Sequence, residues 1–170
     1  MTRLTILPVD FGDPAQTGDF LFLLDHYMRG PSGIGQPMSE ALRASLPAEL
    51  RRRPTVLSFI AYLGEEGDRR AAGLIDCIEG FSTFAGKPLL NVHDIVVHED
   101  FRRRGIARAL LAHAEQVARE RDCCKLTLEV LDGNAGARDA YLKFGFRPYQ
   151  LDPAMGAATL MEKTLQAHSS

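Results

Sequence analysis

The chain of 170 residues lacks the features of several protein classes. Basic residues are not in excess, since 20 Lys and Arg face 22 Asp and Glu and the formal net charge is −2. A protein that binds nucleic acid would be expected to present a basic surface. No apolar run is long enough to span a membrane, and the N-terminal residues lack the apolar core of a signal peptide. We therefore expect no nucleic-acid partner and no membrane partner.

Cysteine is also scarce, with only Cys77, Cys123 and Cys124. Two of the three are adjacent and none forms a Cys-x-x-Cys pair, so the sequence suggests neither a disulfide framework nor a zinc site. We expect reduced thiols, a cytoplasmic location and no metal. Repeats and low-complexity segments are absent, and the length fits one globular domain.

Arginine clusters at two places, residues 51–53 and 102–104. We interpret the first cluster as a solvated helix end, where cations complement the helix dipole. The second cluster lies between an apolar, β-rich run at 92–97 and an amphipathic run at 106–118. A basic, glycine-containing turn from strand to helix directs backbone N–H groups outward at the positive end of the helix dipole, which favours phosphate. Taken alone, the same residues also fit an exposed basic corner.

The spacing in this turn is Arg102-x-x-Gly105-x-Ala107. It is neither the dinucleotide fingerprint G-x-G-x-x-G nor a P-loop, which would continue as Gly-Lys-Ser/Thr. Gly105 lets the backbone approach a ligand without a Cβ in the way. After a predicted helix at 106–121 and a short strand at 125–130, a second block begins with Asn134 and continues to Tyr141. This second helix ends at Gly145 and Phe146, and glycine suits the left-handed residue that terminates a helix.

The two blocks, in this order, resemble the acetyl-CoA-binding motifs of the GNAT N-acetyltransferase superfamily. Its pyrophosphate loop reads (Gln/Arg)-x-x-Gly-x-(Gly/Ala), and its second motif has Asn opening a helix and Tyr seven positions on. The resemblance covers residues 89–149 well and the N-terminal half in outline. Residues 81–97 also resemble diamine (spermidine/spermine-type) acetyltransferases, although His93 stands where those enzymes carry an acidic residue.

The resemblance implies the GNAT fold, which is α/β (α+β). We expect one mixed, largely antiparallel sheet of about seven strands with helices on both faces, splayed between the strands before and after the phosphate-loop helix. One domain would comprise an acceptor-site half at 1–88, an acetyl-CoA core at 89–150, and a C-terminal strand and tail at 151–170. Asp13 and Ser39 are predicted to cap two helices, the second interrupted at Pro47. The other strands are predicted at 4–9, 55–63, 70–78, 146–151 and 157–165, with a long connection at 79–88.

The resemblance also assigns residues to acetyl-CoA. Backbone N–H groups of the loop would bind the pyrophosphate, and the pantetheine amides would pair with the strand that feeds it. An N–H near Ile95 or Val96 would face the developing oxyanion. Asn134 would contact the pantetheine arm or ordered water, although an Asn after Asp-Gly is also a natural helix N-cap. The full cofactor-binding set is Ile95, Val96, Val97, Arg102, Arg103, Arg104, Gly105, Ile106, Ala107, Arg108 and Asn134.

Tyr141 is the predicted general acid, because a phenol is protonated at neutral pH and can donate to a departing thiolate. Its helical face also carries apolar residues, which would suit a core aromatic. Candidates for the general base are His93, Asp94 and Glu129, and for each a plain structural role is equally open. Neighbours on a strand point to opposite faces, so His93 and Asp94 cannot both face the amine unless a bulge intervenes.

The acceptor is predicted to be a primary amine of a small molecule, but the sequence does not identify it. Within the enzyme class, a protein or peptide N-acetyltransferase would use the loop at 31–37 as the wall of a groove. A regulatory module that binds acyl-CoA without turnover is a further alternative. A homodimer is left open.

Overall fold

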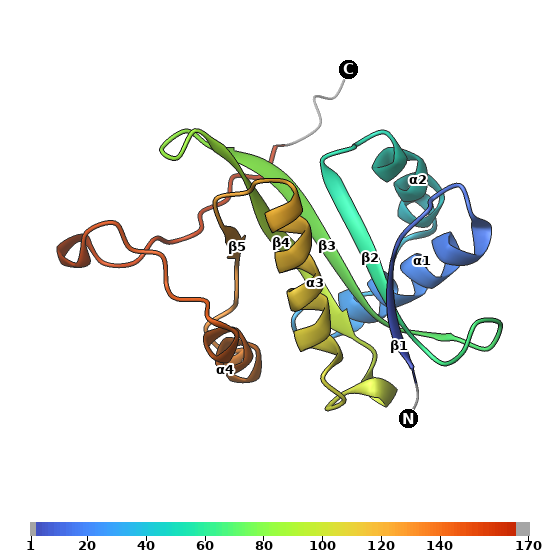
Figure 1. The fold of residues 1–170 in the computed structure, drawn as a ribbon. Helices are drawn as coiled ribbons and strands as arrows, with labels where there is room; N and C mark the ends of the chain where they lie inside the picture. The colour runs from blue at the N-terminus through green and yellow to red at the C-terminus, as the bar shows by residue number, and fades with distance from the viewer. Residues whose placement is uncertain (1–2, 166–170) are drawn as a thin grey trace, which may run out of the picture. The chain divides into compact units, whose positions relative to one another are not determined.

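The computed structural model describes residues 3–165 (Figure 1). Within this range one mixed sheet has five strands in sequence order. The first four strands pair antiparallel with one another in sequence order, and the last runs parallel to the fourth. The strands are β1 (Leu4–Pro8), β2 (Val56–Leu63), β3 (Arg70–Ser82), β4 (Lys87–Val97) and β5 (Leu126–Leu128).

Four α-helices and two short 3-10 helices complete the described residues. The α-helices are α1 (Pro14–Arg29), α2 (Glu40–Arg51), α3 (Ile106–Glu120) and α4 (Ala135–Phe144). The 3-10 helices are η1 (Glu99–Phe101) and η2 (Pro153–Met155). The chain divides after Asn134 into two compact units, so the whole sheet and α1–α3 belong to the first unit and α4 to the second.

The predicted caps are present at α1 and α2. The Asp13 carboxylate accepts a hydrogen bond from the Ala15 backbone N–H at 2.9 Å, and the Ser39 hydroxyl accepts one from the Leu42 N–H at 3.2 Å. The predicted interruption at Pro47 is wrong, because α2 continues through it to Arg51. Proline removes one hydrogen bond from a helix, and here the apolar side chains of α2 pack against the core around it, which offsets the loss.

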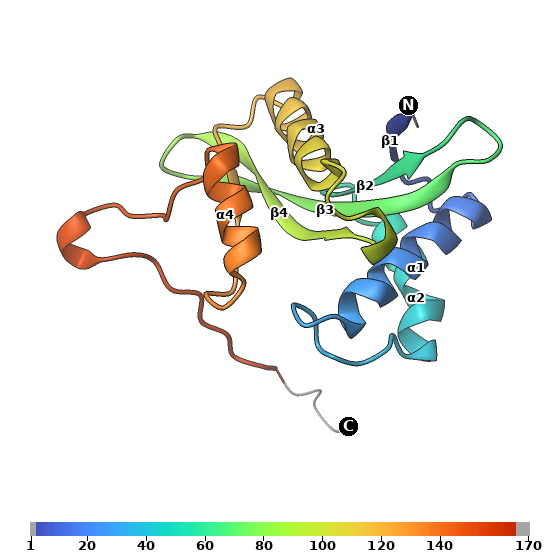
Figure 2. The same cartoon turned by 90° about the horizontal axis from the view of Figure 1, so that it is seen from below.

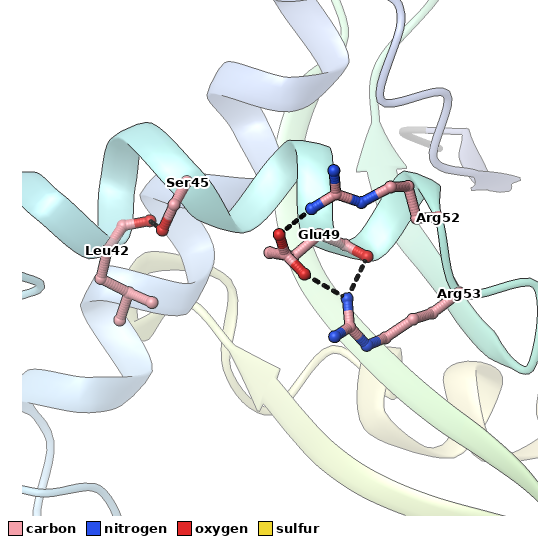
Figure 3. Close-up of polar contacts among 5 residues, drawn as sticks. All are labelled: Leu42, Ser45, Glu49, Arg52 and Arg53. Carbon is pink, nitrogen blue, oxygen red and sulfur yellow. Dashed lines mark hydrogen bonds and ion pairs between the residues drawn. The ribbon is translucent and has the colours of Figure 1, made fainter. Parts of the chain in front are cut away.

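The end of α2 confirms that the first arginine cluster is a solvated helix end. Glu49 forms ion pairs with Arg52 and Arg53 from the same last turn (Figure 3). Nη1 of Arg53 also donates to the Glu49 carbonyl at 2.7 Å (Figure 3), and both guanidinium groups are exposed. Arg53 therefore satisfies a backbone carbonyl near the C-terminus of this helix.

Helices cover both faces of the sheet in the first unit, with α1 and α2 on one face and α3 on the other (Figure 2). On the α1 face, Phe20 and Leu23 of α1 pack with Ile60, Leu74 and Val96 of three strands. On the α3 face the helix approaches the sheet at a glycine. A Cβ on Gly73 would lie only 3.1 Å from Ile106 Cγ2 and 3.2 Å from Leu110 Cδ1.

Two predicted features of the sheet differ from the structure. The segments at 146–151 and 157–165 form no strand among the described residues, so the expected count of about seven strands is not reached. Their apolar residues resemble strand patterns, but a strand needs a hydrogen-bonding partner, and within the first segment Pro148 supplies no N–H. The long connection expected at 79–88 is instead a hairpin. β3 runs to Ser82, and the Gly86 N–H donates to the Ser82 carbonyl at 2.8 Å.

Candidate active site

The turn between β4 and α3 has the backbone of an anion-binding loop. Arg103 and Gly105 both adopt positive φ, at 62° and 76°. Gly105 is the N-cap of α3, and no side chain of the described residues caps this helix. The first hydrogen bond along the helix runs from the Ala109 N–H to the Gly105 carbonyl at 3.0 Å. The N–H groups of residues 106–108 consequently have no partner within the helix, and a ligand oxygen can accept from them.

The loop is open on the side where a ligand would approach. Nothing lies within 4 Å of the position that a Gly105 Cβ would occupy. Two of the arginines are engaged by the loop itself, because Arg102 Nε donates to the Val97 carbonyl at 3.5 Å and Arg104 Nη2 to the Asp100 carbonyl at 3.4 Å. Ile106 is 2% exposed, so it can offer a ligand only its backbone. These contacts favour main-chain rather than side-chain binding of an anion.

The strand that feeds this loop has a half-free edge. β5 pairs with β4 only from Leu90 to Val92. Residues 94–97 pair with β3 on one side, and in the part of the chain that the structure describes no strand pairs with residues 93–97 on the other. The backbone of Ile95, Val96 and Val97 can thus accept an extended ligand that carries amide groups, in the manner of an added strand.

A β-bulge lies in β4 at the start of this free edge. Val92 is paired with Cys77, whereas Asp94 is paired with Asp76, so His93 is an inserted residue without a partner on β3. Adjacent Asp76 and Cys77 point to opposite faces, and therefore Val92 and Asp94 do as well, although they are two residues apart. His93 and Asp94 could both face the amine only if a bulge intervened; a bulge is present, and it frees His93 from the alternation of the strand.

Asp94 lies on the sheet face that α1 covers. Burial raises the pKa of its carboxyl, and the positive charge of His93 opposes this rise. Burial also raises the pKa of the Tyr27 hydroxyl on α1, and the nearby Asp94 charge adds to the effect. Asp94 therefore combines partial burial with a histidine neighbour, which suits a group that exchanges a proton.

Asp76 is a titratable residue that the sequence reasoning missed. It lies opposite Asp94 and is only 6% exposed. Burial raises its pKa to about 7; the Asp94 charge adds to the rise, and the Ser58 hydroxyl opposes it. One signal was visible in the sequence. A single carboxylate stands within the apolar run Leu74–Ile78, where a buried strand would have to accommodate it.

Asn134 lies directly before α4 and contacts the loop at 31–37. Its Nδ2 donates to the Ser32 hydroxyl at 3.0 Å. The ends of this loop are held by α1, because the Gly35 N–H donates to the Met28 carbonyl at 2.9 Å and the Met38 N–H to the Asp25 carboxylate at 2.7 Å. The loop is thus tied to elements of the same unit at three points.

Tyr141 belongs to the second unit. It is half-buried in α4, and its ring lies 6.0 Å from that of Phe146 in an edge-on arrangement. The helix ends at Gly145, which has a φ of 118°, as its sequence position indicated. The acid role of Tyr141 and the basic roles of His93 and Glu129 stay predictions. Among the described residues there is no group of three His, Cys, Asp or Glu that could hold a metal, and no helix that could cross a membrane.

Comparison with known proteins shows the family of this chain. The acetyltransferase (GNAT) family profile matches residues 22–146. The chain belongs to the GNAT acetyltransferase family. It is 38% identical over 105 residues to streptothricin acetyltransferase of Streptomyces lavendulae, covering 58% of this chain and 56% of that protein. It is 35% identical over 86 residues to thialysine N-epsilon-acetyltransferase of Caenorhabditis elegans, covering 51% of each.

A solved structure extends the likeness in fold to nearly the whole chain. An aminoglycoside N-acetyltransferase in complex with CoA superposes with a TM-score of 0.73, at 15% identity, over 98% of this chain and 97% of that one. The GNAT chain described here spans about half the length of the two sequence relatives above.

Proposed function

We propose that this GNAT protein is an acetyl-CoA-dependent N-acetyltransferase whose acceptor is a primary amine of a small molecule. The observation that carries the proposal is the uncapped start of α3 beside the half-free edge of β4. The first offers N–H groups to a pyrophosphate, and the second offers a strand edge to the amides of pantetheine. Both features lie on one continuous segment, residues 93–108.

Different residues bind the cofactor, stabilise the oxyanion and donate the proton. Backbone N–H groups of Gly105, Ile106, Ala107 and Arg108 hold the pyrophosphate, while Arg103 and Arg108 side chains add positive charge around it. A backbone N–H near Ile95 or Val96 stabilises the oxyanion that forms when the amine attacks the thioester carbonyl. The C–S bond then breaks, and Tyr141 donates its proton to the departing thiolate.

The amine must lose a proton before it attacks, because an ammonium has no lone pair. Asp94 is the proposed acceptor of this proton, and the inserted His93 is the alternative. A carboxylate that is partly removed from water attracts an ammonium more strongly than an exposed one does. The named activities of the two sequence relatives, on streptothricin and thialysine, support a small amine as the acceptor.

The test is release of free thiol from acetyl-CoA in the presence of streptothricin, thialysine, a peptide with a free N-terminus, or no acceptor. We expect release with at least one of the two small amines. Release with the peptide alone would instead indicate a peptide acetyltransferase. Tight binding of acetyl-CoA without any release would indicate a regulatory module.

Binding at the loop is tested by calorimetry with the matched variants Gly105→Glu and Gly86→Glu. Both glycines have positive φ and open space around them, but Gly86 lies in the hairpin turn before β4. Glutamate at 105 places bulk and negative charge where phosphate should bind, so affinity for acetyl-CoA should fall by about two powers of ten or more. Gly86→Glu should bind as the wild type does. Equal affinities in the two folded variants would remove the loop assignment.

A further inference from the structure

Three polar residues form a row across three neighbouring strands on the α1 face of the sheet. Ser58 of β2 lies opposite Asp76 of β3, and Asp76 lies opposite Asp94 of β4. Residues directly opposite each other on antiparallel strands share a face, with Cβ atoms about 5 Å apart. The row therefore places a hydroxyl and two carboxyls side by side beneath α1.

The two buried members of this row, Ser58 and Asp76, have unmet hydrogen-bonding capacity. Asp76 and Ser58 are each 6% exposed. Neither Asp76 Oδ1 nor the Ser58 hydroxyl oxygen forms a hydrogen bond of good geometry with any described residue. A buried carboxylate oxygen without a hydrogen-bond partner is costly, so a proton on Asp76 or a cation close by would stabilise it.

The groups that face the two carboxyls come from each surrounding element. β4 contributes His93, α1 contributes Tyr27, and β2 contributes Ser58. In the described part of the chain neither carboxyl forms an ion pair with a lysine or an arginine. Besides His93, the described residues thus place no lysine or arginine against the pair, and a substrate ammonium can supply the balancing charge.

We propose that Asp76 and Asp94 form one acid–base pair of the acceptor site, in which buried Asp76 acts through Asp94 and makes it a stronger proton acceptor for the substrate ammonium. This inference rests on the proposed function. In the working form both carboxyls are ionised. The N–H bond of the ammonium breaks, an O–H bond forms on Asp94, and the pair then holds one proton. Taking up this proton relieves the repulsion between two like charges, which favours the transfer.

Asp76 is thus a positioning residue, since Asp94 stands between it and the amine. The raised pKa of Asp76, about 7, agrees with a pair that loses its last proton near neutral pH. The pair also explains the bulge. If β4 alternated regularly through His93, Asp94 would share the face of Val92, which is the α3 face; the bulge turns Asp94 to the α1 face instead.

The experiment measures kcat against pH for the wild type, Asp76→Asn and Ser58→Ala, with saturating acetyl-CoA and whichever of streptothricin or thialysine is acetylated. Asparagine removes the inner charge, so the acid limb of the profile should move to lower pH by about one unit or more, and the maximal kcat should fall about tenfold. Removing the Ser58 hydroxyl takes away the group that opposes the rise in the pKa of Asp76, so the limb should move to higher pH. Loss of packing alone would not move the acid limbs of the Asp76→Asn and Ser58→Ala profiles in opposite directions.

A third variant, Asp94→Asn, tests whether Asp76 acts through Asp94. In this background the change Asp76→Asn should no longer shift the profile, as a double-mutant cycle requires for coupled residues. An unshifted limb in Asp76→Asn with a functional wild type would overturn the inference and leave the proposed function intact. If the wild type acetylates neither amine, the proposed function fails, and the role of the pair in acetyl transfer fails with it.

Discussion

Replacing Asp76 by asparagine should stabilise the protein at pH 8. This gain in stability over the wild type should shrink progressively as the pH falls to 4. The native carboxyl is buried on the α1 face and has a pKa of about 7, against an ordinary value of 3.8. Between these two values the native state holds a proton on Asp76 that the unfolded chain has released. The free energy of unfolding of the wild type must therefore decrease as the pH rises through this window. Asparagine has no proton to lose, so the variant lacks this decrease.

The magnitude follows from the difference between the two pKa values. Each pH unit corresponds to about 1.4 kcal/mol, so the difference in stability between variant and wild type should grow by about 4 kcal/mol from pH 4 to pH 8. The side chain is almost fully buried, and solvent screening reduces this value little. An unpaired asparagine amide adds a cost of about 1–3 kcal/mol, but that cost is nearly independent of pH.

The assay is urea unfolding of both proteins at several pH values between 4 and 8, with the difference in unfolding free energy plotted against pH. Titrating groups that are not coupled to Asp76, among them His26 and His113 with lowered pKa, act equally in both proteins and cancel in the difference, whereas the coupled Asp94 contributes to it. A difference that stays constant over this range would show that Asp76 titrates normally, and the reasoning on the buried row would be refuted.

Three further predictions concern catalysis and packing. Tyr141→Phe keeps the ring but removes the proton donor, so kcat should fall about tenfold or more while calorimetry shows unchanged affinity for acetyl-CoA; wild-type turnover would make Tyr141 a packing residue. Asp94→Asn should lower kcat and alter the pH profile if Asp94 accepts the ammonium proton. It should raise only KM for the amine if Asp94 merely attracts the ammonium. His93→Gln, measured in parallel, decides which of the two residues is the base. Gly73→Val should lower the free energy of unfolding in urea by several kcal/mol, because its side chain would meet Ile106 and Leu110 of α3, whereas Gly80→Val, with only one flexible leucine nearby, should cost less.

The phosphate loop and the elements around it could be predicted because each carries a local signal. The cap residues Asp13 and Ser39, the strand before the loop and the helix after it all express chemistry within a few residues. Gly105 was singled out for its lack of a Cβ, and its φ of 76° is a conformation that glycine adopts readily. Local signals thus located the caps, the strand, the turn and the helix along the chain.

What could not be predicted depends on pairing between distant segments. The bulge at His93 exists only in relation to Cys77 and Asp76 on β3, and no pattern within β4 indicates an inserted residue. Asp76 was passed over for the same reason, since its partner Asp94 lies 18 positions away in the sequence. The prediction of two C-terminal strands was wrong for the converse reason. Residues 146–165 have a strand-like pattern, but a pattern does not guarantee a partner.

The half-free edge of β4 has a consequence for the protein in solution. Among residues 3–165 no strand pairs with the outer edge of residues 93–97, so an extended segment of another chain can add there, and natural proteins usually protect such edges with charge, proline or a covering element. Here the sequence over 95–97 is Ile-Val-Val, which has high β-propensity and carries no charge. A bound ligand that occupies the edge would act as its shield, so the colloidal stability of the protein is linked to the ligand supply. Light scattering at rising protein concentration should show self-association without CoA that is suppressed when CoA is added.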